Sequence, residues 1–272
     1  MSGKMSEIME AVNQIWKRRT NVSDPKYWDD DAEYYGEIAL PAPQNDDLMA
    51  LICSVIDFKG DENVIDIGCG SGQYAVALAS MAGHCLGVDF SGGMVETAKQ
   101  RAGQLNNVRF EKLDWHVAET SSDILKNGFD VSIAHTTPAI SDADSFRKMV
   151  EITRGAGFIT FCTRRTDILT DNMWKSFGLR GNLPRNESAV PCSLAILWDK
   201  GIDPEIHYQK GVIWDDPAPY SKALFLCRSS ALSRGYSDLG AVEEYVRSIT
   251  DADGNVPNRI ETDLTTVYWV VE

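Results

Sequence analysis

The residues of this sequence that are best suited to chemistry are a group of glycines and the acid beside it. Gly68, Gly70 and Gly72 follow the apolar segment 64–67 in a GxGxG pattern, and Asp66 lies two residues before the first glycine. Glycine adopts φ angles that other residues avoid, so a ligand can touch the backbone there. Dinucleotide-binding proteins use GxGxxG, which this segment lacks, so the pattern disfavours a nicotinamide oxidoreductase.

Two further aspartates end the next two apolar segments. Asp89 follows 85–88, and Asp114 follows 108–112 with Trp115 beside it. An acid in the first of these positions accepts hydrogen bonds from both hydroxyls of a ribose. An acid in the second accepts from an adenine amino group, while its aromatic neighbour walls the ring. Carboxylates at the ends of three successive strands would outline one crevice with the shape of a nucleoside.

The elements that must position these acids alternate between strands and helices. The apolar runs 64–67, 85–88, 108–112, 129–134 and 158–162 are predicted as strands, with helical patterns between them. Such alternation predicts a parallel sheet that helices cover on both faces. We therefore expect an α/β fold.

Four segments carry a resemblance to a known family: VIDIGCGSGQYAVALA, GVDFSGGMVETAKQRA, LDW and FDVSIAHTTPAI. They resemble the class I S-adenosylmethionine-dependent methyltransferases, in particular the family of the ubiquinone/menaquinone-biosynthesis methylases and many small-molecule enzymes. The resemblance covers roughly residues 48–165 and two late strands, 205–214 and 265–271. It implies a Rossmann-like, seven-stranded, mostly parallel sheet with an antiparallel last strand, and helical insertions that form a lid.

The same resemblance implies S-adenosyl-L-methionine as cofactor, S-adenosyl-L-homocysteine as product, and a set of binding residues. Asp66 and Gly68 would lie along the methionine part, Gly70 would also bind the cofactor, and Asp89 would hold the ribose. The other positions expected against the cofactor are Phe90, Met94, Asp114, Trp115, Ala134 and, from the N-terminal segment, Tyr27. It also suggests three parts: a helical cap (1–47), the cofactor-binding core (48–165) and a C-terminal part with insertions for substrate (166–272).

His135 is the candidate catalytic residue, because it follows the fourth strand, where the methyl group should point. Histidine titrates near neutrality and could act as a general base for an acceptor that is protonated at pH 7. A structural histidine that bonds to the backbone is the alternative. The aromatic residues Tyr34 and Trp174, together with His135, are candidates for substrate contact, and core packing is the alternative for both aromatics.

Composition narrows the partners and the compartment. The chain has 272 residues, 43% of them hydrophobic, and a net charge of −14, which repels nucleic-acid phosphates. Its six cysteines show no zinc-ligand spacing, so no metal site is expected. No apolar run reaches the length of a membrane span, and the N-terminus lacks a signal-peptide pattern. We expect a cytoplasmic protein with a small-molecule substrate, and a homodimer is an open alternative.

The function that we expect is methyl transfer to a small-molecule acceptor by direct in-line attack. A protein or RNA methyltransferase of the same fold is one alternative. A cofactor-binding partner subunit without catalysis is another, because binding residues alone do not establish turnover.

Overall fold

The computed structural model describes residues 2–17, 25–181 and 188–271, and it packs as two compact units. The first comprises Met1–Phe161, Ser188–His207 and Thr265–Glu272, and the second comprises Cys162–Glu187 and Tyr208–Leu264. This division follows the packing of the chain. The functional division into a cap, a cofactor-binding core and a C-terminal part stays a prediction.

The main sheet has seven strands in the order β3-β2-β1-β4-β5-β9-β6. Its first five strands along the chain are β1 (Asn63–Ile67), β2 (His84–Asp89), β3 (Val108–Lys112), β4 (Phe129–His135) and β5 (Thr153–Asp167), and all their pairings are parallel. The late strands are β6 (Pro204–Asp215) and β9 (Arg259–Val270). Short runs of apolar and β-branched residues between turns favour these strands.

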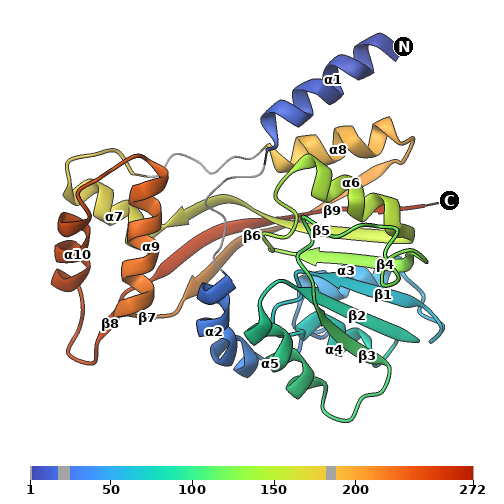
Figure 1. The fold of residues 1–272 in the computed structure, drawn as a ribbon, viewed down its shortest axis with the longest axis horizontal. Helices are drawn as coiled ribbons and strands as arrows, with labels where there is room; N and C mark the ends of the chain where they lie inside the picture. Colours follow the sequence, from blue (N-terminus) through green and yellow to red (C-terminus); the bar gives the residue numbers. More distant parts are fainter. Residues whose placement is uncertain (1, 18–24, 182–187, 272) are drawn as a thin grey trace. The chain divides into compact units, whose positions relative to one another are not determined.

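The last strand runs against its neighbour β5. The Val271 N–H donates to the Gly155 carbonyl, whereas Thr266 bonds to Thr160 farther along β5, so residue numbers rise on one strand as they fall on the other. This order and direction confirm the predicted Rossmann-like sheet with an antiparallel last strand (Figure 1). β9 begins at Arg259, earlier than the predicted strand over 265–271.

Helices cover both faces of the sheet in the first unit. One core joins the strands to α6 (Ala143–Ile152), α8 (Ala189–Asp199) and the end of α1 (Ser2–Ile15), and the other joins them to α3 (Asp47–Val55), α4 (Gln73–Leu78) and α5 (Gly92–Ala102). Side chains alternate between these cores along a strand: Ile65 and Ile67 belong to the first and Val64 to the second.

Helix α2 (Pro25–Glu37), which lies in the predicted helical cap but whose bounds the sequence did not indicate, contacts α5 at both of its ends. Near its start, Asp29 accepts hydrogen bonds from the Ser91 hydroxyl (2.6 Å) and the Gly93 N–H (2.8 Å), so it helps to cap α5. Near its end, the Arg101 guanidinium donates to the carbonyls of Tyr35, Gly36 and Ile38. These carbonyls are the unsatisfied acceptors that any helix end presents.

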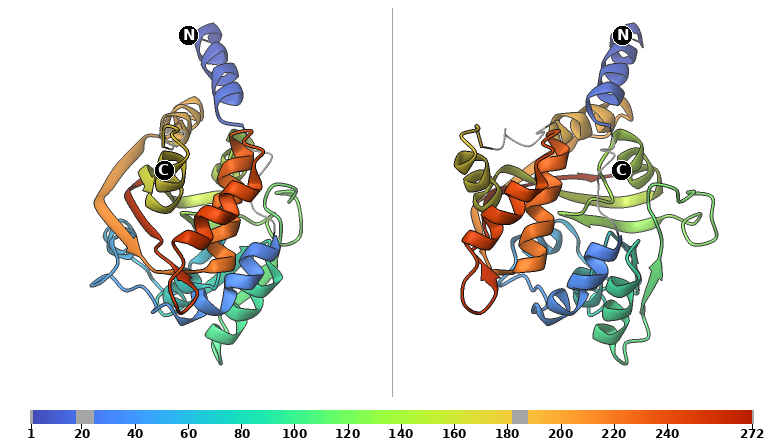
Figure 2. Two further views of the ribbon diagram at one scale, coloured as in Figure 1. Left: turned by 90° about the vertical axis from the view of Figure 1, so that its left-hand side faces the viewer. Right: turned by 60° about the vertical axis from the view of Figure 1, so that its left-hand side comes forward.

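The second unit has its own apolar core. Helices α7 (Ile168–Ser176), α9 (Tyr220–Ser233) and α10 (Leu239–Ser248) pack with a short antiparallel pair, β7 (Ala218–Pro219) and β8 (Asn255–Val256). Figures 1 and 2 show α9 and α10 side by side. Within the described residues, no helix combines the length and the apolar character that crossing a bilayer requires.

Close packing between β5 and β9 gives a test of the fold. A β-carbon on Gly157 would overlap the buried Trp269 ring, so Gly157→Ala should lower the free energy of unfolding by roughly 1–3 kcal/mol. Gly92→Ala is the matched control, because its nearest neighbour is the flexible end of Lys112 at 3.5 Å. Denaturant unfolding measures both variants, and equal midpoints would contradict this packing.

Candidate functional site

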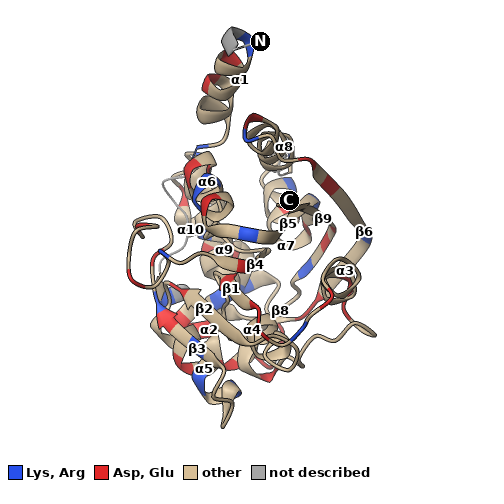
Figure 3. Cartoon of the chain, turned by 90° about the vertical axis from the view of Figure 1, so that its right-hand side faces the viewer, with Lys and Arg blue, Asp and Glu red and all other residues tan. Residues whose placement is uncertain are grey.

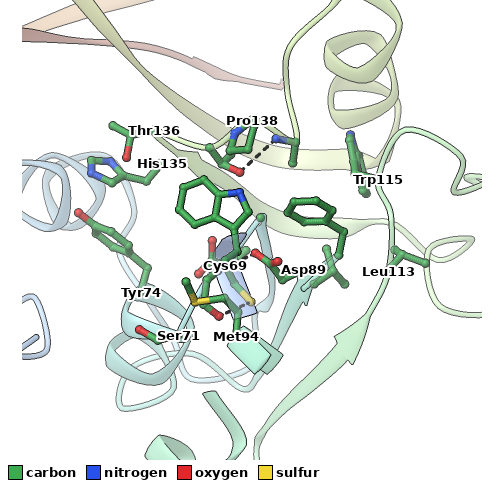
Figure 4. Close-up of a pocket in the computed structure, with 18 of the residues that line it drawn as sticks. Cys69, Ser71, Tyr74, Asp89, Met94, Leu113, Trp115, His135, Thr136 and Pro138 are labelled. Carbon is green, nitrogen blue, oxygen red and sulfur yellow. Dashed lines mark hydrogen bonds between the residues drawn. The ribbon is translucent and has the colours of Figure 1, made fainter. Parts of the chain in front are cut away.

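A cavity opens in the first unit where β1, β2, β3 and β4 end, and the space in and in front of it, open solvent included, is about 1040 Å³. Figure 4 shows Tyr74, His135 and Thr136 at one end, Trp115 and Leu113 at the other, and Asp89 between them. Nine of the predicted site residues line this cavity: Asp66, Gly68, Gly70, Asp89, Phe90, Met94, Asp114, Trp115 and His135. The topology thus brings together residues that are up to 69 positions apart in the chain (135 − 66).

The glycine loop needs its glycines for two physical reasons. Gly68, Gly70 and Gly72 have φ angles of 67°, 52° and 78°, in the left-handed region that favours glycine. A β-carbon on Gly68 would also overlap the Thr137 side chain. The loop can therefore pass close to the loop after β4, and the two loops together form one wall of the cavity.

Asp89 connects the glycine loop to the start of α5. One of its carboxylate oxygens accepts from the Gly70 N–H and the other from the Ser91 N–H, both at 2.9 Å. Burial raises the pKa of Asp89, although these backbone bonds oppose the shift. Each carboxylate oxygen has a second lone pair, so Asp89 can still accept two hydroxyl donors from a ligand.

Asp66 is buried and one of its carboxylate oxygens, Oδ2, has no hydrogen-bond partner among the described residues. Burial raises its pKa to about 7, and the charge of Asp89 adds to the shift. Gln73 Nε2 and His135 Nδ1, which also belong to cavity-lining residues, are buried without a described partner as well. Buried polar groups are normally hydrogen-bonded, so these three atoms fit a polar ligand in the cavity.

At one end of the cavity the loop after β3 forms a wall. Trp115 is almost completely buried, and its indole N–H donates to the Ser145 carbonyl at 3.0 Å. Asp114 accepts from the His116 N–H at 2.9 Å through one carboxylate oxygen. The His116 ring lies 3.2 Å from the Ser141 hydroxyl and 3.5 Å from the Asp142 carboxylate, at the start of α6. This end therefore combines a carboxylate with a fixed aromatic plane.

At the other end, His135 packs against Tyr74 with their ring centroids 4.9 Å apart. The Tyr74 hydroxyl donates to Asp46 at 3.0 Å. Burial lowers the pKa of His135 to about 4, against a smaller opposite effect of the Asp46 charge, so the imidazole is neutral at pH 7. The next residue, Thr136, has a φ of 47°, which is strained for a β-branched side chain and turns the loop into the cavity wall.

Three other predicted residues lie outside the cavity lining. Ala134 is buried within β4, and Tyr34 is exposed on α2 with its ring edge-on to Tyr35. Trp174 belongs to the core of the second unit, where its indole N–H donates to Ser230 at 3.1 Å and Arg234 lies over its ring. The Tyr27 side chain lies outside the described part of the chain.

Trp28 and Tyr35 line the cavity, and they come from an aromatic N-terminal stretch that the sequence suggests as a roof of the pocket; Tyr74 also lines it, and sequence reasoning did not select it. Trp28 and Tyr35 are seven residues apart on α2 and share one helix face. That spacing was the available signal, but it becomes readable only when 25–37 is taken as a helix. Tyr74 comes two residues after the last glycine of the loop, in the first turn of α4.

Comparisons with known proteins agree with this geometry. Residues 58–177 match a family model described as a methyltransferase domain. An uncharacterised protein of Haemophilus influenzae is 26% identical over 193 residues, which are 68% of this chain and 66% of that protein. A 23S rRNA uracil C5-methyltransferase of Xanthomonas axonopodis pv. citri is 26% identical over 127 residues, 45% of this chain. The match spans only 29% of that enzyme's length.

Among solved structures, the fold is similar to that of phosphoethanolamine N-methyltransferase 2 of Haemonchus contortus in complex with S-adenosyl-L-methionine. The TM-score is 0.51 at 18% identity, over 93% of this chain and 58% of that chain. Residues 58–177 therefore form a methyltransferase domain, and the sheet order and the glycine loop after β1 agree with the class I S-adenosylmethionine-dependent fold that the sequence predicts. The cofactor of methyltransferases with that fold is S-adenosylmethionine, as the sequence predicts.

The raised pKa of Asp66 gives a test that needs no ligand. Because its folded-state pKa is near 7 and an exposed Asp titrates near 3.8, its contribution to stability is complete below pH 4 and is lost as the pH rises to 7. The free energy of unfolding of the wild type, minus that of Asp66→Asn, should fall by about 3 kcal/mol between pH 4 and pH 7. Denaturant titrations at both pH values measure this difference. For the control Asp123→Asn, which changes an exposed carboxylate, the difference from the wild type should be the same at both pH values. The same result for Asp66→Asn would rule out the raised pKa of Asp66.

Proposed function

We propose that this chain transfers the methyl group of S-adenosylmethionine to a small-molecule acceptor in the cavity, by direct in-line attack. The observation that carries this proposal is the chemical character of the residues that line the cavity. Carboxylates from three neighbouring strand ends lie along one side, while the His135 end is aromatic and uncharged. Among the lining residues that the structure describes, none is Lys or Arg.

In the proposed arrangement the cofactor lies along the strand ends. Asp89 accepts the two ribose hydroxyls with the lone pairs that its backbone bonds leave available. Asp114 and Trp115 hold the adenine, and Phe90 and Met94 border it. Asp66, Gly68 and Gly70 lie along the methionine part, where the unpartnered Asp66 oxygen would pair with the cationic ammonium group. Ala134, which is buried in β4 next to His135, would flank the methyl group.

The bound sulfonium supplies an electrophilic methyl group, so the main task of the protein is to hold the acceptor in line with it. Such positioning lowers a barrier by as much as ~7–11 kcal/mol. We assign that role at the reacting end to His135, whose neutral imidazole has the unpartnered Nδ1 atom to bond the acceptor. A group with a pKa near 4 is a poor base toward an alcohol. The proposed acceptor is therefore an amine, a thiol or an acidic carbon, whose proton leaves to solvent.

Charge supports a small acceptor over RNA. The chain carries a net charge of −14, and Figure 3 shows acidic and basic residues interspersed on α5 and α6. Aromatic residues Trp28, Tyr35 and Tyr74 in the lining suit a partly apolar molecule. RNA remains the second candidate because of the rRNA methyltransferases among the relatives. We further propose a reducing compartment such as the cytoplasm, since the six cysteines, which all lie in the described part of the chain, form no disulfide with one another.

Asp89→Asn tests the placement of the cofactor. The amide removes the charge and one acceptor oxygen, and hydrogen bonds to charged groups contribute ~1.5–3 kcal/mol each. The dissociation constant for S-adenosylhomocysteine, measured by calorimetry, should rise about 10- to 100-fold. Asp123→Asn, an exposed carboxylate, should bind like the wild type. Wild-type affinity in Asp89→Asn would contradict the proposed ribose contact.

His135 can be tested through the pH dependence of turnover. Because its pKa lies near 4, the wild-type kcat should show no histidine inflection between pH 6 and pH 9. His135→Ala should lower kcat by about tenfold at every pH in that range, as the loss of one orienting hydrogen bond predicts. If the wild type instead loses activity below pH 7 and His135→Ala abolishes that dependence, His135 acts as a general base with an ordinary pKa.

The acceptor class can be found with cofactor that carries a labelled methyl group. The protein is incubated with a metabolite extract, with total RNA and with a protein fraction in parallel, and Asp89→Asn serves as the control for each. Label in the metabolite fraction supports the proposal, and label in RNA favours the second candidate. Label in none of the three, with intact cofactor binding, would favour a partner subunit without catalysis.

A further inference from the structure

Helix α6 holds the loop that follows β3, and Lys148 makes the central contacts. Its ammonium group donates to the carbonyls of Trp115 and Ala118 at 2.6 Å and to that of His116 at 3.3 Å. Lys148 is half-buried, and its Nζ atom also lies 5.6 Å from the centroid of the Trp115 ring. All three N–H groups of the ammonium are thus used on one short segment of chain.

The first turn of α6 fixes the side chains of the same segment. The Trp115 indole donates to the Ser145 carbonyl, and the His116 ring contacts Asp142, which caps the helix. Burial would raise the pKa of Asp142, but hydrogen bonds from His116 and Ser145 outweigh it and hold that pKa well below its usual value. The backbone and the side chains of the loop are therefore held by one rigid element.

An ammonium group suits this position better than other side chains. It is a compact donor whose three N–H groups can meet three converging carbonyls, whereas the guanidinium of arginine is a wide planar fork. A cation placed out of water is costly unless such partners surround it. Burial lowers the pKa of Lys148, which indicates that its surroundings are partly shielded from solvent. Lys148 does not line the cavity, so it acts through the loop that it holds.

We propose that Lys148 is a positioning residue that sets the base selectivity of the nucleoside site. By holding the Trp115 and His116 carbonyls, it fixes Asp114 and the Trp115 ring in the orientation that distinguishes adenine from another purine. This inference rests on the proposed placement of adenine at Asp114 and Trp115. What is new is the role of Lys148, which holds the loop that carries Asp114 and Trp115 in place.

The test compares two ligands that differ only in the base: S-adenosylhomocysteine and S-inosylhomocysteine, whose hypoxanthine carries a carbonyl in place of the amino group. Calorimetry on the full chain gives both dissociation constants. The wild type should prefer the adenine compound by about tenfold, the value of one hydrogen bond. In Lys148→Met the ratio should fall to within about twofold, mainly through weaker binding of the adenine compound. Lys126→Met, an exposed lysine paired with Asp123, should keep the wild-type ratio.

Each outcome decides the inference. If Lys148→Met weakens both ligands by the same factor, or keeps the wild-type ratio, Lys148 has only a structural role and the inference is overturned. If the wild type binds the adenine compound without preferring it, the adenine placement fails and the inference fails with it. If Lys148→Met does not fold, Lys148→Gln, which keeps two N–H donors, should give an intermediate ratio; an unchanged ratio in that variant would overturn the inference.

Discussion

The structure depends on a constraint of parallel sheets: strands that run the same way end at the same edge. Asp66 lies near the end of β1 and Asp89 ends the neighbouring strand β2, so both carboxylates are buried at this edge, and the charge of Asp89 raises the pKa of Asp66. Hydrogen bonds from the backbone N–H groups of Gly70 and Ser91 offset the cost of burying the Asp89 carboxylate, but one oxygen of Asp66 has no described partner. A cationic ligand supplies what this arrangement lacks, and this is why the site suits a sulfonium compound with an ammonium group.

The two ends of the cavity differ in chemistry because different elements hold them. The Trp115 end is fixed by polar contacts from α6, whereas the Tyr74 end is a pair of aromatic rings without a charge on the imidazole. A rigid polar end is suited to recognising one constant molecule. An uncharged aromatic end is suited to an acceptor that varies between enzymes of one fold, since apolar contact depends on shape more than on hydrogen-bond geometry.

Sequence reasoning predicted the sheet and the glycine loop, and it placed the three acids at one edge of the sheet, where they line one cavity. These features depend on local spacing and on the rule that parallel strands end together. Sequence reasoning placed residues 1–47 in a helical cap but did not locate α2, whose Asp and aromatic residues have low helix propensity and whose stability comes from contacts of Asp29 and Arg101 with distant residues. Without the helix, the shared face of Trp28 and Tyr35 could not be recognised. The lowered pKa of His135 was also unpredictable, since burial depends on tertiary packing.

The contacts that hold α2 against α5 have a consequence for fragments of this protein. The matched domain begins at residue 58, so an expression fragment cut to that match would contain all three acids and would omit α2. It would lose Trp28 and Tyr35 from the lining, the Tyr35 carbonyl that the Ser71 hydroxyl bonds at 2.8 Å, and the Asp29 cap on α5. Such a fragment would expose the glycine loop to water, and inhibitor screening on it would sample a shallower, more polar groove than the whole chain presents.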